Sequence, residues 1–305
     1  GHQLLREAKN KFSEIPFVLM TAFGTIQKAV AAMHDGAVDY LVKPFEAEVL
    51  INTIADYLPN DELLDGSLVA EDPKTIEMVK LTQRVAKSDA TVMICGESGT
   101  GKEVFAKEIH RSSGRNKMPF IAINCAAIPE NMLEAMLFGY EKGAFTGAYK
   151  SSPGKFEQAN GGSLLLDEIS EMDLSLQAKL LRVLQEREVE RLGGSKTIPL
   201  DVRVIATTNR EMKREVKEGR FREDLYYRLS EISINIPSVK EREGDAVLLA
   251  RTFLEKFSQE FNRKTPGITN NAILGIENYP WPGNVRELRN VLERGVVLME
   301  ENTLS

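Results

Sequence analysis

The chain has 305 residues, enough for about two domains that each bury a core of their own. Hydrophobic residues make up 42% and charged residues 28%, as in ordinary globular proteins, and no apolar run reaches membrane-spanning length. A net charge of -6 argues against a protein built mainly to coat DNA.

The sequence contains two isolated cysteines, Cys95 and Cys125, without a C-x-x-C motif, and three scattered histidines without zinc spacing. We expect no signal peptide. We therefore expect both cysteines to be small buried residues at strand ends. The compartment is expected to be the reducing cytoplasm, with no membrane partner.

Residues 1–57 alternate between helical and strand patterns. The expected elements are a helix with Leu4, Leu5 and Ala8 on one face, a strand at 17–20, a helix at 25–34, a strand at 38–42 and a last helix that ends at Leu58.

Two stretches of this segment, Met20-Thr21-Ala22 and Asp39 to Phe45, resemble the second half of a response-regulator receiver domain, a flavodoxin-like fold. The resemblance implies that Thr21 and Lys43 contact an aspartyl phosphate and that Tyr40 moves on activation. In that family the acceptor aspartate precedes the point where this chain begins, so we expect no phosphorylation here. The missing strands would expose a sheet edge and favour disorder or association. The alternative, which the sequence favours, is an inert remnant packed on its neighbour.

Residues 58–73 are polar and rich in helix breakers, as in a linker. In residues 74–237, apolar runs of strand length alternate with helical patterns. The expected elements are a helix at 75–87, strands at 91–95, 120–124, 163–168, 202–208 and 232–236, and an amphipathic helix that includes 176–184. This alternation predicts a parallel sheet covered on both faces, with ligands at the carboxyl ends of the strands.

The first of these strands leads into a glycine-rich loop and a helix. The loop, Gly96-Glu97-Ser98-Gly99-Thr100-Gly101-Lys102, fits the G-x-x-x-x-G-K phosphate-binding pattern. Its glycines let the backbone wrap closely around a phosphate with N–H groups pointing inward. The helix N-terminus adds partial positive charge, and the Lys102 ammonium can reach the β- and γ-phosphates. The loop is therefore predicted to bind a nucleoside triphosphate, ATP.

Glu103 stands where such loops usually carry the Ser or Thr that ligates magnesium, so the metal must be held in another way or through water. Asp167 and Glu168 follow three leucines and supply the second half of an ATPase site. Hydrolysis needs a metal on the phosphates and a water aligned for in-line attack. We assign Asp167 to Mg²⁺ and Glu168 to the general base. Two carboxylates beside a triphosphate repel one another, so a cation is required.

Asn209 comes at the end of the next strand, after Thr207 and Thr208. It could orient the attacking water or sense the γ-phosphate. Its residue type alone also fits a simple turn former.

Residues 238–305 show helical patterns only, and we expect a small helical lid. One apolar stripe consists of Val247, Ala250, Leu254, Phe257 and Phe261. Asn284-Val-Arg-Glu287 is predicted to be a capping box that opens a helix through Val297.

From about Leu64 to Ser305 the chain resembles the AAA+ domain of NtrC-type bacterial enhancer-binding proteins, the activators of sigma-54 RNA polymerase. The phosphate loop with Glu103 is that family's own form. Phe221 to Leu229 matches its arginine-finger segment, and Trp281 to Leu288 matches its lid motif. The resemblance implies an α/β fold, a P-loop parallel sheet covered by helices with a helical lid, preceded by the truncated receiver segment.

The resemblance also implies roles for single residues. Asn124 would restrain the catalytic glutamate before hydrolysis, and Arg286 would take the sensor II role. Arg222 and Arg228 would be arginine fingers for the adjacent subunit's γ-phosphate, an effect worth roughly 10³–10⁵ in rate, so a homo-oligomeric ring, a hexamer or heptamer, is expected. The alternative is that Arg210 to Arg228 is merely a solvated stretch of mixed charge.

Gly143-Ala144-Phe145-Thr146-Gly147-Ala148 places one aromatic and one hydroxyl among small residues. From composition alone, a tight turn that tucks Phe145 into the core is the preferred interpretation. The resemblance reverses this, because all six residues agree with the loop that contacts sigma-54 in that family.

The resulting hypothesis is a ring-forming ATPase that remodels the sigma-54 RNA polymerase closed complex under two-component control. The first alternative is a nucleotide-dependent scaffold without remodelling, and the second is a general protein-unfolding AAA+ enzyme. DNA recognition would come only from a C-terminal domain that family members carry beyond Ser305. Target promoters, the cognate kinase and the sign of receiver control cannot be inferred.

Overall fold

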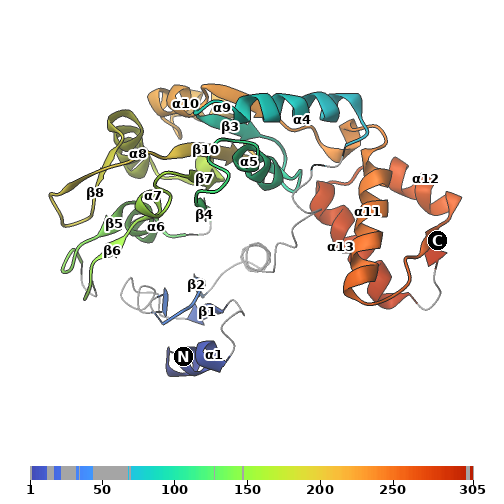
Figure 1. Cartoon of the computed structure of the whole chain (residues 1–305), viewed down its shortest axis with the longest axis horizontal. Coiled ribbons are helices and arrows are strands. Elements are labelled where there is room, and N and C mark those ends of the chain that lie inside the picture. The colour runs from blue at the N-terminus through green and yellow to red at the C-terminus, as the bar shows by residue number, and fades with distance from the viewer. Residues whose placement is uncertain are drawn as a thin grey trace.

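The computed structural model describes residues 2–11, 17–21, 32–33, 35–43, 68, 70–126, 128–145, 148–299 and 303–304 (Figure 1). Within these ranges, no helix is both long enough and apolar enough to cross a bilayer.

The centre of the chain is a five-stranded sheet in which all neighbouring strands are parallel, in the order β11-β3-β10-β7-β4. The strands are β3 (Val92–Cys95), β4 (Phe120–Asn124), β7 (Ser163–Asp167), β10 (Arg203–Thr208) and β11 (Ile232–Asn235). This confirms the predicted parallel sheet. Because β3, β10 and β7 are adjacent, the phosphate loop, Thr208 and Asp167 lie at one edge.

Apolar side chains cover both faces of the sheet, because successive residues of a strand point to opposite sides. On β7, Leu164 and Leu166 belong to one buried cluster and Leu165 to the other. The Leu165 face is covered by α4 (Pro73–Ala86) and α5 (Lys102–Arg111). The opposite face is covered by α6 (Glu130–Phe138), α7 (Lys155–Gln158), α8 (Leu174–Glu186), α9 (Met212–Lys217) and α10 (Glu223–Leu229).

Two short antiparallel hairpins project from this second side (Figure 1). They are β5 (Gly139–Tyr140) with β6 (Ser152–Pro153), and β8 (Glu188–Glu190) with β9 (Thr197–Pro199). Neither hairpin is predicted from the sequence, because strands of two or three residues are too short to show a periodic pattern.

The C-terminal helices α11 (Asp245–Glu260), α12 (Asn270–Asn278) and α13 (Asn284–Leu298) form a separate core. The predicted stripe is partly wrong: Phe261 is 41% exposed, whereas Phe253, which it omits, is buried beside Phe257. The expectation of helices alone is also wrong, because β12 (Gly267–Ile268) pairs in parallel with β13 (Thr303–Leu304). A helical period cannot reveal so short a pairing between residues far apart in the chain.

A clasp of two aspartates ties this helical part to the chain before α4. The Asp245 carboxylate accepts the N–H groups of Glu71 (2.7 Å) and Asp72 (2.9 Å), and Asp72 accepts the N–H of Glu243 (3.2 Å). Asp72 also caps α4 by accepting from Thr75 (3.0 Å).

The N-terminal segment contains α1 (His2–Lys11) and a parallel pair, β1 (Val18–Thr21) with β2 (Asp39–Val42). Of the predicted face of α1, Leu5 is buried, but Leu4 is 70% exposed and lies outside the core. Tyr40 and Leu5 join an apolar cluster with Met132 of α6, so this segment packs on the α/β part. The predicted helix at 25–34 (except 32–33), the last helix to Leu58 and the linker up to 67 lie outside the described residues.

Candidate functional site

The phosphate loop connects β3 to α5 with the local geometry that its glycines predict. Gly101, at φ +96°, is the residue before the helix, and Gly99 has φ +78°. A side chain on Gly99 would also lie 2.4 Å from the Gly283 carbonyl oxygen, so glycine is required there by both the backbone and the packing. The buried Thr100 hydroxyl donates to the Glu97 carbonyl (2.8 Å) and closes the loop.

Lys102 begins α5 and is almost fully buried. Its ammonium donates to the carbonyl oxygens of Gly96 (3.0 Å) and Glu97 (3.2 Å) and lies 3.5 Å from a Glu168 carboxylate oxygen. The ammonium therefore lies between the loop and the end of β7, where a bound phosphate chain would meet both.

Asp167 ends β7, and Glu168 follows it in a left-handed conformation, φ +50°. The Thr207 hydroxyl hydrogen-bonds to the Asp167 carboxylate and accepts the Glu168 N–H (3.1 Å). Loss of hydration raises the pKa of Asp167, against the effect of the Thr207 hydrogen bond. Thr207 has no role predicted from the sequence, although its neighbours in the strand indicate a polar strand end.

Asn124 and Asn209 flank the two carboxylates from the neighbouring strands. The Asn124 amide nitrogen lies 3.3 Å from Asp167, while its oxygen accepts the Ala126 N–H (2.9 Å). Asn209 contacts Glu168 through its backbone N–H (3.1 Å), and its side chain is exposed. Both asparagines reach the predicted edge, and their roles stay predictions.

The lid reaches the phosphate loop through the start of α13. The Arg286 guanidinium donates to the Ser98 hydroxyl (3.3 Å), and the Asn284 amide donates to Glu97 (3.0 Å) and to the Ser98 carbonyl (3.1 Å). Asn284 is therefore not the predicted cap. Gly283 is the residue before the helix, and the Glu287 carboxylate accepts the Gly283 N–H (2.8 Å). With φ +51°, Asn284 directs its side chain to the loop instead.

Arg242, which the sequence analysis does not single out, is buried beneath the same loop. Its guanidinium donates to the carbonyl oxygens of Thr100 (3.0 Å) and Pro237 (2.8 Å). Burial lowers the pKa of this guanidinium, although nearby carboxylates oppose that effect. No sequence pattern signals Arg242, because its partners are carbonyl groups that any residue could provide.

Glu103 lies in the first turn of α5, half exposed, and pairs with Lys107 (3.0 Å). Burial chiefly raises the pKa of Asp167, and the charge of Glu103 adds to that effect. Among the residues that the structure describes, no three His, Cys, Asp or Glu side chains could hold a metal by themselves. Mg²⁺ usually takes one or two carboxylates together with substrate phosphates, and Asp167 and Glu168 fit that donor set.

The two cysteines are free, and the prediction that both are buried is confirmed for Cys125 only. Cys125 is buried directly after β4, and Cys95, the last residue of β3, is half-buried. Burial raises the pKa of both thiols.

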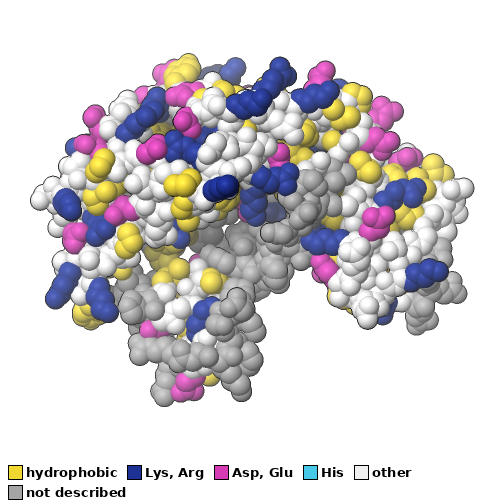
Figure 2. Space-filling view, viewed as in Figure 1, with side chains coloured by type: hydrophobic (Ala, Val, Ile, Leu, Met, Phe, Trp, Pro, Cys, Tyr) yellow, Lys and Arg dark blue, Asp and Glu magenta, His cyan; other side chains and the backbone are white. Residues whose placement is uncertain are grey.

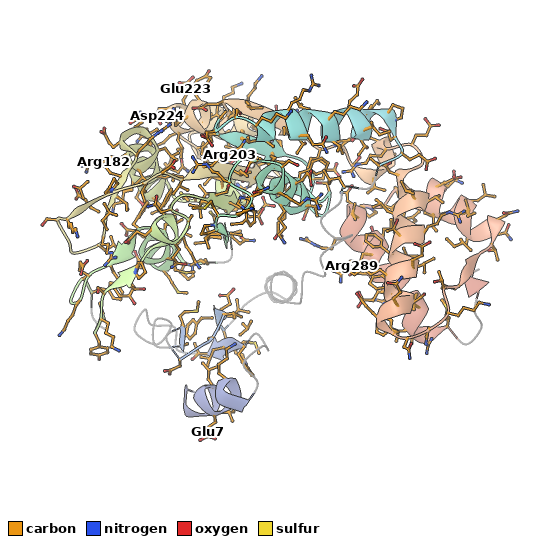
Figure 3. All side chains as sticks on the ribbon, viewed as in Figure 1. Glu7, Arg182, Arg203, Glu223, Asp224 and Arg289 are labelled. Carbon is orange, nitrogen blue, oxygen red and sulfur yellow. The ribbon has the colours of Figure 1, made fainter. Side chains whose placement is uncertain are left out.

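Arg222 and Arg228 lie on or beside α10, and their partners belong to other regions than the phosphate loop. Arg222 donates to Asp224 (2.7 Å), and Figure 3 places Asp224 at the outer edge of the molecule. Arg228 donates to Glu231 (2.9 Å) and to the Leu184 carbonyl (3.0 Å). Both guanidinium groups are partly exposed.

The Gly143–Ala148 loop extends from the β5–β6 hairpin, directly after α6. The Gly143 N–H donates to the Ala148 carbonyl (2.8 Å), so the two ends of the loop meet. Phe145 is half-buried with its ring 5.0 Å from that of Tyr140, and Ala144 contacts Gly193. Thr146 and Gly147 lie outside the described residues.

Arg191 joins the second hairpin to the base of this loop. It donates to Glu157 on α7 (2.7 Å) and to Glu141 (3.1 Å), and these bonds lower the pKa of Glu157 and raise that of Arg191. Main-chain bonds add to the contact, from Glu141 to Leu192 and from Leu192 to Gly139, each about 3 Å. This clamp is not predicted from the sequence, because Glu157 and Glu141 lie 34 and 50 positions from Arg191.

The predicted receiver residues are brought together in part. Thr21 pairs with Val42, and the Lys43 N–H donates to the Thr21 carbonyl (2.7 Å), so Thr21 and Lys43 are neighbours. Lys43 is exposed, whereas Tyr40 is buried.

Figure 2 shows basic and acidic side chains intermixed over the visible face of the molecule, without one continuous basic surface.

Comparison with known proteins agrees with this geometry. Residues 68–235 match the family model of the sigma-54 interaction domain, residues 240–305 that of an AAA+ ATPase lid domain, and residues 1–55 that of the response regulator receiver domain.

Three relatives illustrate the similarity. The chain is 54% identical to the response regulator protein FleR of Pseudomonas aeruginosa, covering 98% of the chain and 64% of FleR. It is 47% identical to the regulatory protein AtoC of Escherichia coli, covering 98% of the chain and 68% of AtoC. The crystal structure of NtrX from Brucella abortus in complex with ADP superposes with a TM-score of 0.72 at 36% identity, covering 98% of the chain and 67% of NtrX.

Proposed function

The chain belongs to the sigma-54 interaction domain family of AAA+ ATPases, and from this premise we propose that it hydrolyses ATP to remodel the sigma-54 RNA polymerase closed complex. The protein would be a transcriptional activator of the two-component response-regulator type. The receiver match at residues 1–55 and the relatives FleR and AtoC support that assignment.

In this proposal the nucleotide lies between the phosphate loop, the end of β7 and the start of α13. Lys102 would exchange its two carbonyl partners for β- and γ-phosphate oxygens, and Arg286 would approach the phosphates from the lid. NtrX structures were solved with ADP and with ATP, which supports a nucleotide here. Glu168 would remove a proton from the attacking water, and Asn209 would orient that water.

Mg²⁺ would be held by Asp167, with phosphate oxygens completing its coordination, and would neutralise charge on the phosphates. The raised pKa of Asp167 fits this assignment, because a desolvated carboxylate gains from a cation beside it. Thr207 would fix the Asp167 carboxylate through its hydroxyl.

Arg222 and Arg228 would act on the nucleotide of an adjacent subunit in a hexameric or heptameric ring. Their positions support this, because their described partners lie away from the phosphate loop of the same chain. These partners are Asp224, Glu231 and the Leu184 carbonyl. A partly exposed guanidinium can exchange such a partner for a phosphate oxygen.

One observation supports the coupling to sigma-54: the elements that follow Asn124 in the chain lead from the carboxylates to the Gly143–Ala148 loop. Asn124, which contacts Asp167, ends β4, and α6 then leads directly into β5 and the loop. A γ-phosphate that changed the Asn124 contact would move the base of the loop through α6. This coupling requires the loop to make different contacts in the two nucleotide states.

The remaining assignments extend the same proposal. We divide the chain into a receiver part at 1–57, a linker at 58–73, the ATPase α/β part at 74–237 and the lid at 238–305. DNA would be bound through a domain outside these residues. We propose a cytoplasmic location, because the RNA polymerase partner would be found there and the two free cysteines fit a reducing compartment.

Thr146→Ala tests the proposal, because the hydroxyl would contact sigma-54 and take no part in hydrolysis. We expect an ATPase rate within about twofold of the original and loss of promoter opening, measured with sigma-54 holoenzyme on premelted and duplex promoters. Ser151→Ala, just beyond the loop, is the control. Equal loss of both activities in Thr146→Ala would make the loop a structural element and contradict the assignment.

A further inference from the structure

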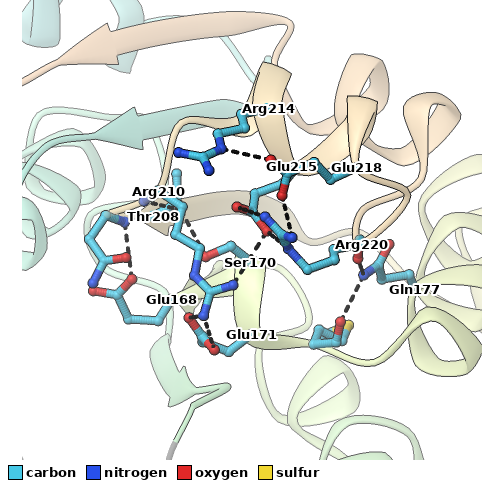
Figure 4. A network of polar contacts seen from close by, with 12 residues as sticks. Glu168, Ser170, Glu171, Gln177, Thr208, Arg210, Arg214, Glu215, Glu218 and Arg220 are labelled. Atoms are coloured by element: carbon cyan, nitrogen blue, oxygen red, sulfur yellow. Dashed lines mark hydrogen bonds and ion pairs between the residues drawn. The ribbon is translucent and has the colours of Figure 1, made fainter.

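A cluster of charged side chains connects the end of β10 to the segment that carries Arg222 (Figure 4). It consists of Arg210, Glu215 and Arg220, which we call the Glu215 cluster. Glu215, on α9, is only 5% exposed although it carries a carboxylate. A carboxylate so buried requires specific partners, so its contacts define what it does.

Toward the proposed nucleotide site, the cluster begins at the end of β10, where the backbone binds the Glu168 carboxylate. The Glu168 carboxylate accepts the N–H of Asn209 (3.1 Å), and Arg210 is the next residue. The Thr208 hydroxyl accepts the Arg210 N–H (3.0 Å) and also bonds the Ser170 hydroxyl (2.9 Å). The backbone at Arg210 is therefore fixed to the edge of the sheet that faces the phosphates.

At the centre, the Arg210 guanidinium lies between two carboxylates, Glu171 (2.8 Å) and Glu215 (3.3 Å). Glu215 in turn holds Arg220 through two bonds, of 2.7 and 2.8 Å. The bonds from Arg220 and then Arg210 lower the pKa of Glu215 to about 2, against the effect of burial. Bidentate pairing of this kind fixes orientation as well as distance.

On the other side, the cluster fixes the backbone from which Arg222 emerges. The Glu215 carbonyl accepts the N–H groups of Arg220 (3.0 Å) and Phe221 (3.2 Å). Gln177, fully buried on α8, donates to the Arg220 carbonyl (3.0 Å) and accepts the Arg222 N–H (2.8 Å). Arg222 is therefore presented from a backbone position that Glu215 and Gln177 determine together.

We propose that Glu215 is a positioning residue that aligns Arg222 for the neighbouring subunit's nucleotide and connects that alignment to the Glu168–Asn209 edge of its own subunit. The proposal rests on the proposed function, in which Arg222 acts across a subunit boundary. A displacement of Glu168 between nucleotide states would alter the Asn209–Arg210 backbone and, through Glu215, the arginine lent to the next site. Hydrolysis in adjacent subunits would then be coordinated.

The test uses Glu215→Gln in the full chain, which keeps the side-chain volume but removes the charge that holds both guanidinium groups. We expect the kcat for ATP to fall roughly tenfold or more, because a small misplacement of a catalytic group has that effect. The KM should change by less than about twofold, since Glu215 does not contact the nucleotide. Glu218→Gln is the matched control, because Glu218 also pairs with Arg220 but not with Arg210.

Mixed rings then decide where Glu215 acts. Glu168→Gln subunits cannot hydrolyse ATP but carry an intact Glu215 cluster, so they can lend a well-aligned Arg222 to an adjacent Glu215→Gln subunit. Adding them should restore the ATPase rate per Glu215→Gln subunit, as it should for Arg222→Ala. The added subunits should not restore the ATPase rate of Asn209→Ala subunits, because the defect of that variant lies in the nucleotide site of the variant subunit itself.

Two results would overturn the inference while leaving the proposed function intact. One is a concentration-dependent ATPase in which Glu215→Gln equals Glu218→Gln, and the other is a Glu215→Gln defect that the added subunits do not relieve. If Glu215→Gln does not fold, Arg210→Gln replaces it, because Arg210 is 39% exposed and the same rescue is expected. A concentration-independent ATPase in the unmodified chain would overturn the proposed function and this inference with it.

Discussion

At the scale of single residues, Asp167 and Glu168 are adjacent in sequence but differ in backbone and in environment. Asp167 completes a strand and is desolvated, whereas Glu168 adopts φ +50°, a conformation that costs a non-glycine residue roughly 1–2 kcal/mol. Thr207 and the Asn209 N–H hold Glu168 in that conformation. Strain of this kind persists where a side chain must be aimed, which supports the general-base role for Glu168.

Glu168→Gln keeps the volume and the backbone of the side chain but cannot accept a proton. We expect ATP to bind with unchanged affinity and turnover to fall by roughly 10²–10⁴, the typical contribution of a general base. Equilibrium binding of a fluorescent ATP analogue and a steady-state phosphate-release assay measure the two quantities. Glu186→Gln, at the exposed end of α8, is the control. Undiminished turnover would remove Glu168 from the role of base.

His110 gives a prediction about acid stability. Its imidazole is buried, with Nδ1 2.9 Å from the Ser163 hydroxyl and the ring tilted against that of Phe120. Burial lowers its pKa below the ordinary value of 6.5. The unfolded chain therefore takes up a proton as the pH falls through 6.5, while the folded chain does not. The stability is full above that pH and decreases below it, by at most ~1.4 kcal/mol per pH unit.

His110→Gln should lose less of its free energy of unfolding than the unmodified chain between about pH 7.5 and pH 5.5. Urea unfolding at the two pH values provides the measurement, and other titrating groups cancel in the difference between the two proteins. Equal losses in both proteins would exclude His110 as the source of acid sensitivity.

At the scale of elements, the Gly143–Ala148 loop depends on its neighbours. Ala144 touches Gly193 of the β8–β9 hairpin, and Arg191 of the same hairpin binds the base of the loop through Glu141 and Glu157. A six-residue loop of small side chains has little packing of its own. The hairpin therefore supports the base of the loop, while the Phe145 ring packs on Tyr140 of β5.

Arg191→Ala should weaken this support without altering the nucleotide pocket. Because Glu157 would remain largely buried without its partner, we expect a loss of about 1–3 kcal/mol in the free energy of unfolding. The ATPase rate should be retained while promoter opening falls. Arg182→Ala, on the exposed surface of α8 near the hairpin, is the control. Full promoter opening by Arg191→Ala would show that the clamp does not support the loop.

At the scale of the whole molecule, two groups of polar contacts between the described residues help to join the lid to the rest of the chain. Asn284 and Arg286 reach the phosphate loop, and Asp245 holds the N–H groups of Glu71 and Asp72 just before α4. The lid is thus tied both to the nucleotide site and to the segment that follows the receiver part. A change at either place can therefore alter the position of the lid.

The ring proposal predicts that the ATPase rate per chain rises steeply with protein concentration. An isolated subunit lacks its neighbour's arginine, which can be worth about 10³–10⁵ in rate. Turnover measured across a dilution series, beside sedimentation of the same samples, tests this. Arg222→Ala should remain slow at every concentration. A diluted monomer that hydrolyses ATP at the full rate would contradict shared sites.

The sequence alone was sufficient for the parallel sheet, the phosphate loop and the carboxylates at the end of β7. Each of these depends on local patterns: apolar runs fit buried strands, and glycines at fixed spacing fit positive φ angles. The relative placement of Lys102, Asp167 and Asn209 also followed, because parallel strands bring their carboxyl ends to one edge.

Only the tertiary structure decided which polar groups meet. Asn284 was expected to cap its own helix, but it binds Glu97, 187 positions away, and Arg203 reaches the carbonyl oxygens that end α4. Glu215 belongs to a mixed-charge stretch that by its composition would be solvated. In the structure it is buried and binds Arg210 and Arg220. A local pattern fixes the backbone of an element, whereas a hydrogen-bond partner is chosen by packing between elements that are distant in sequence.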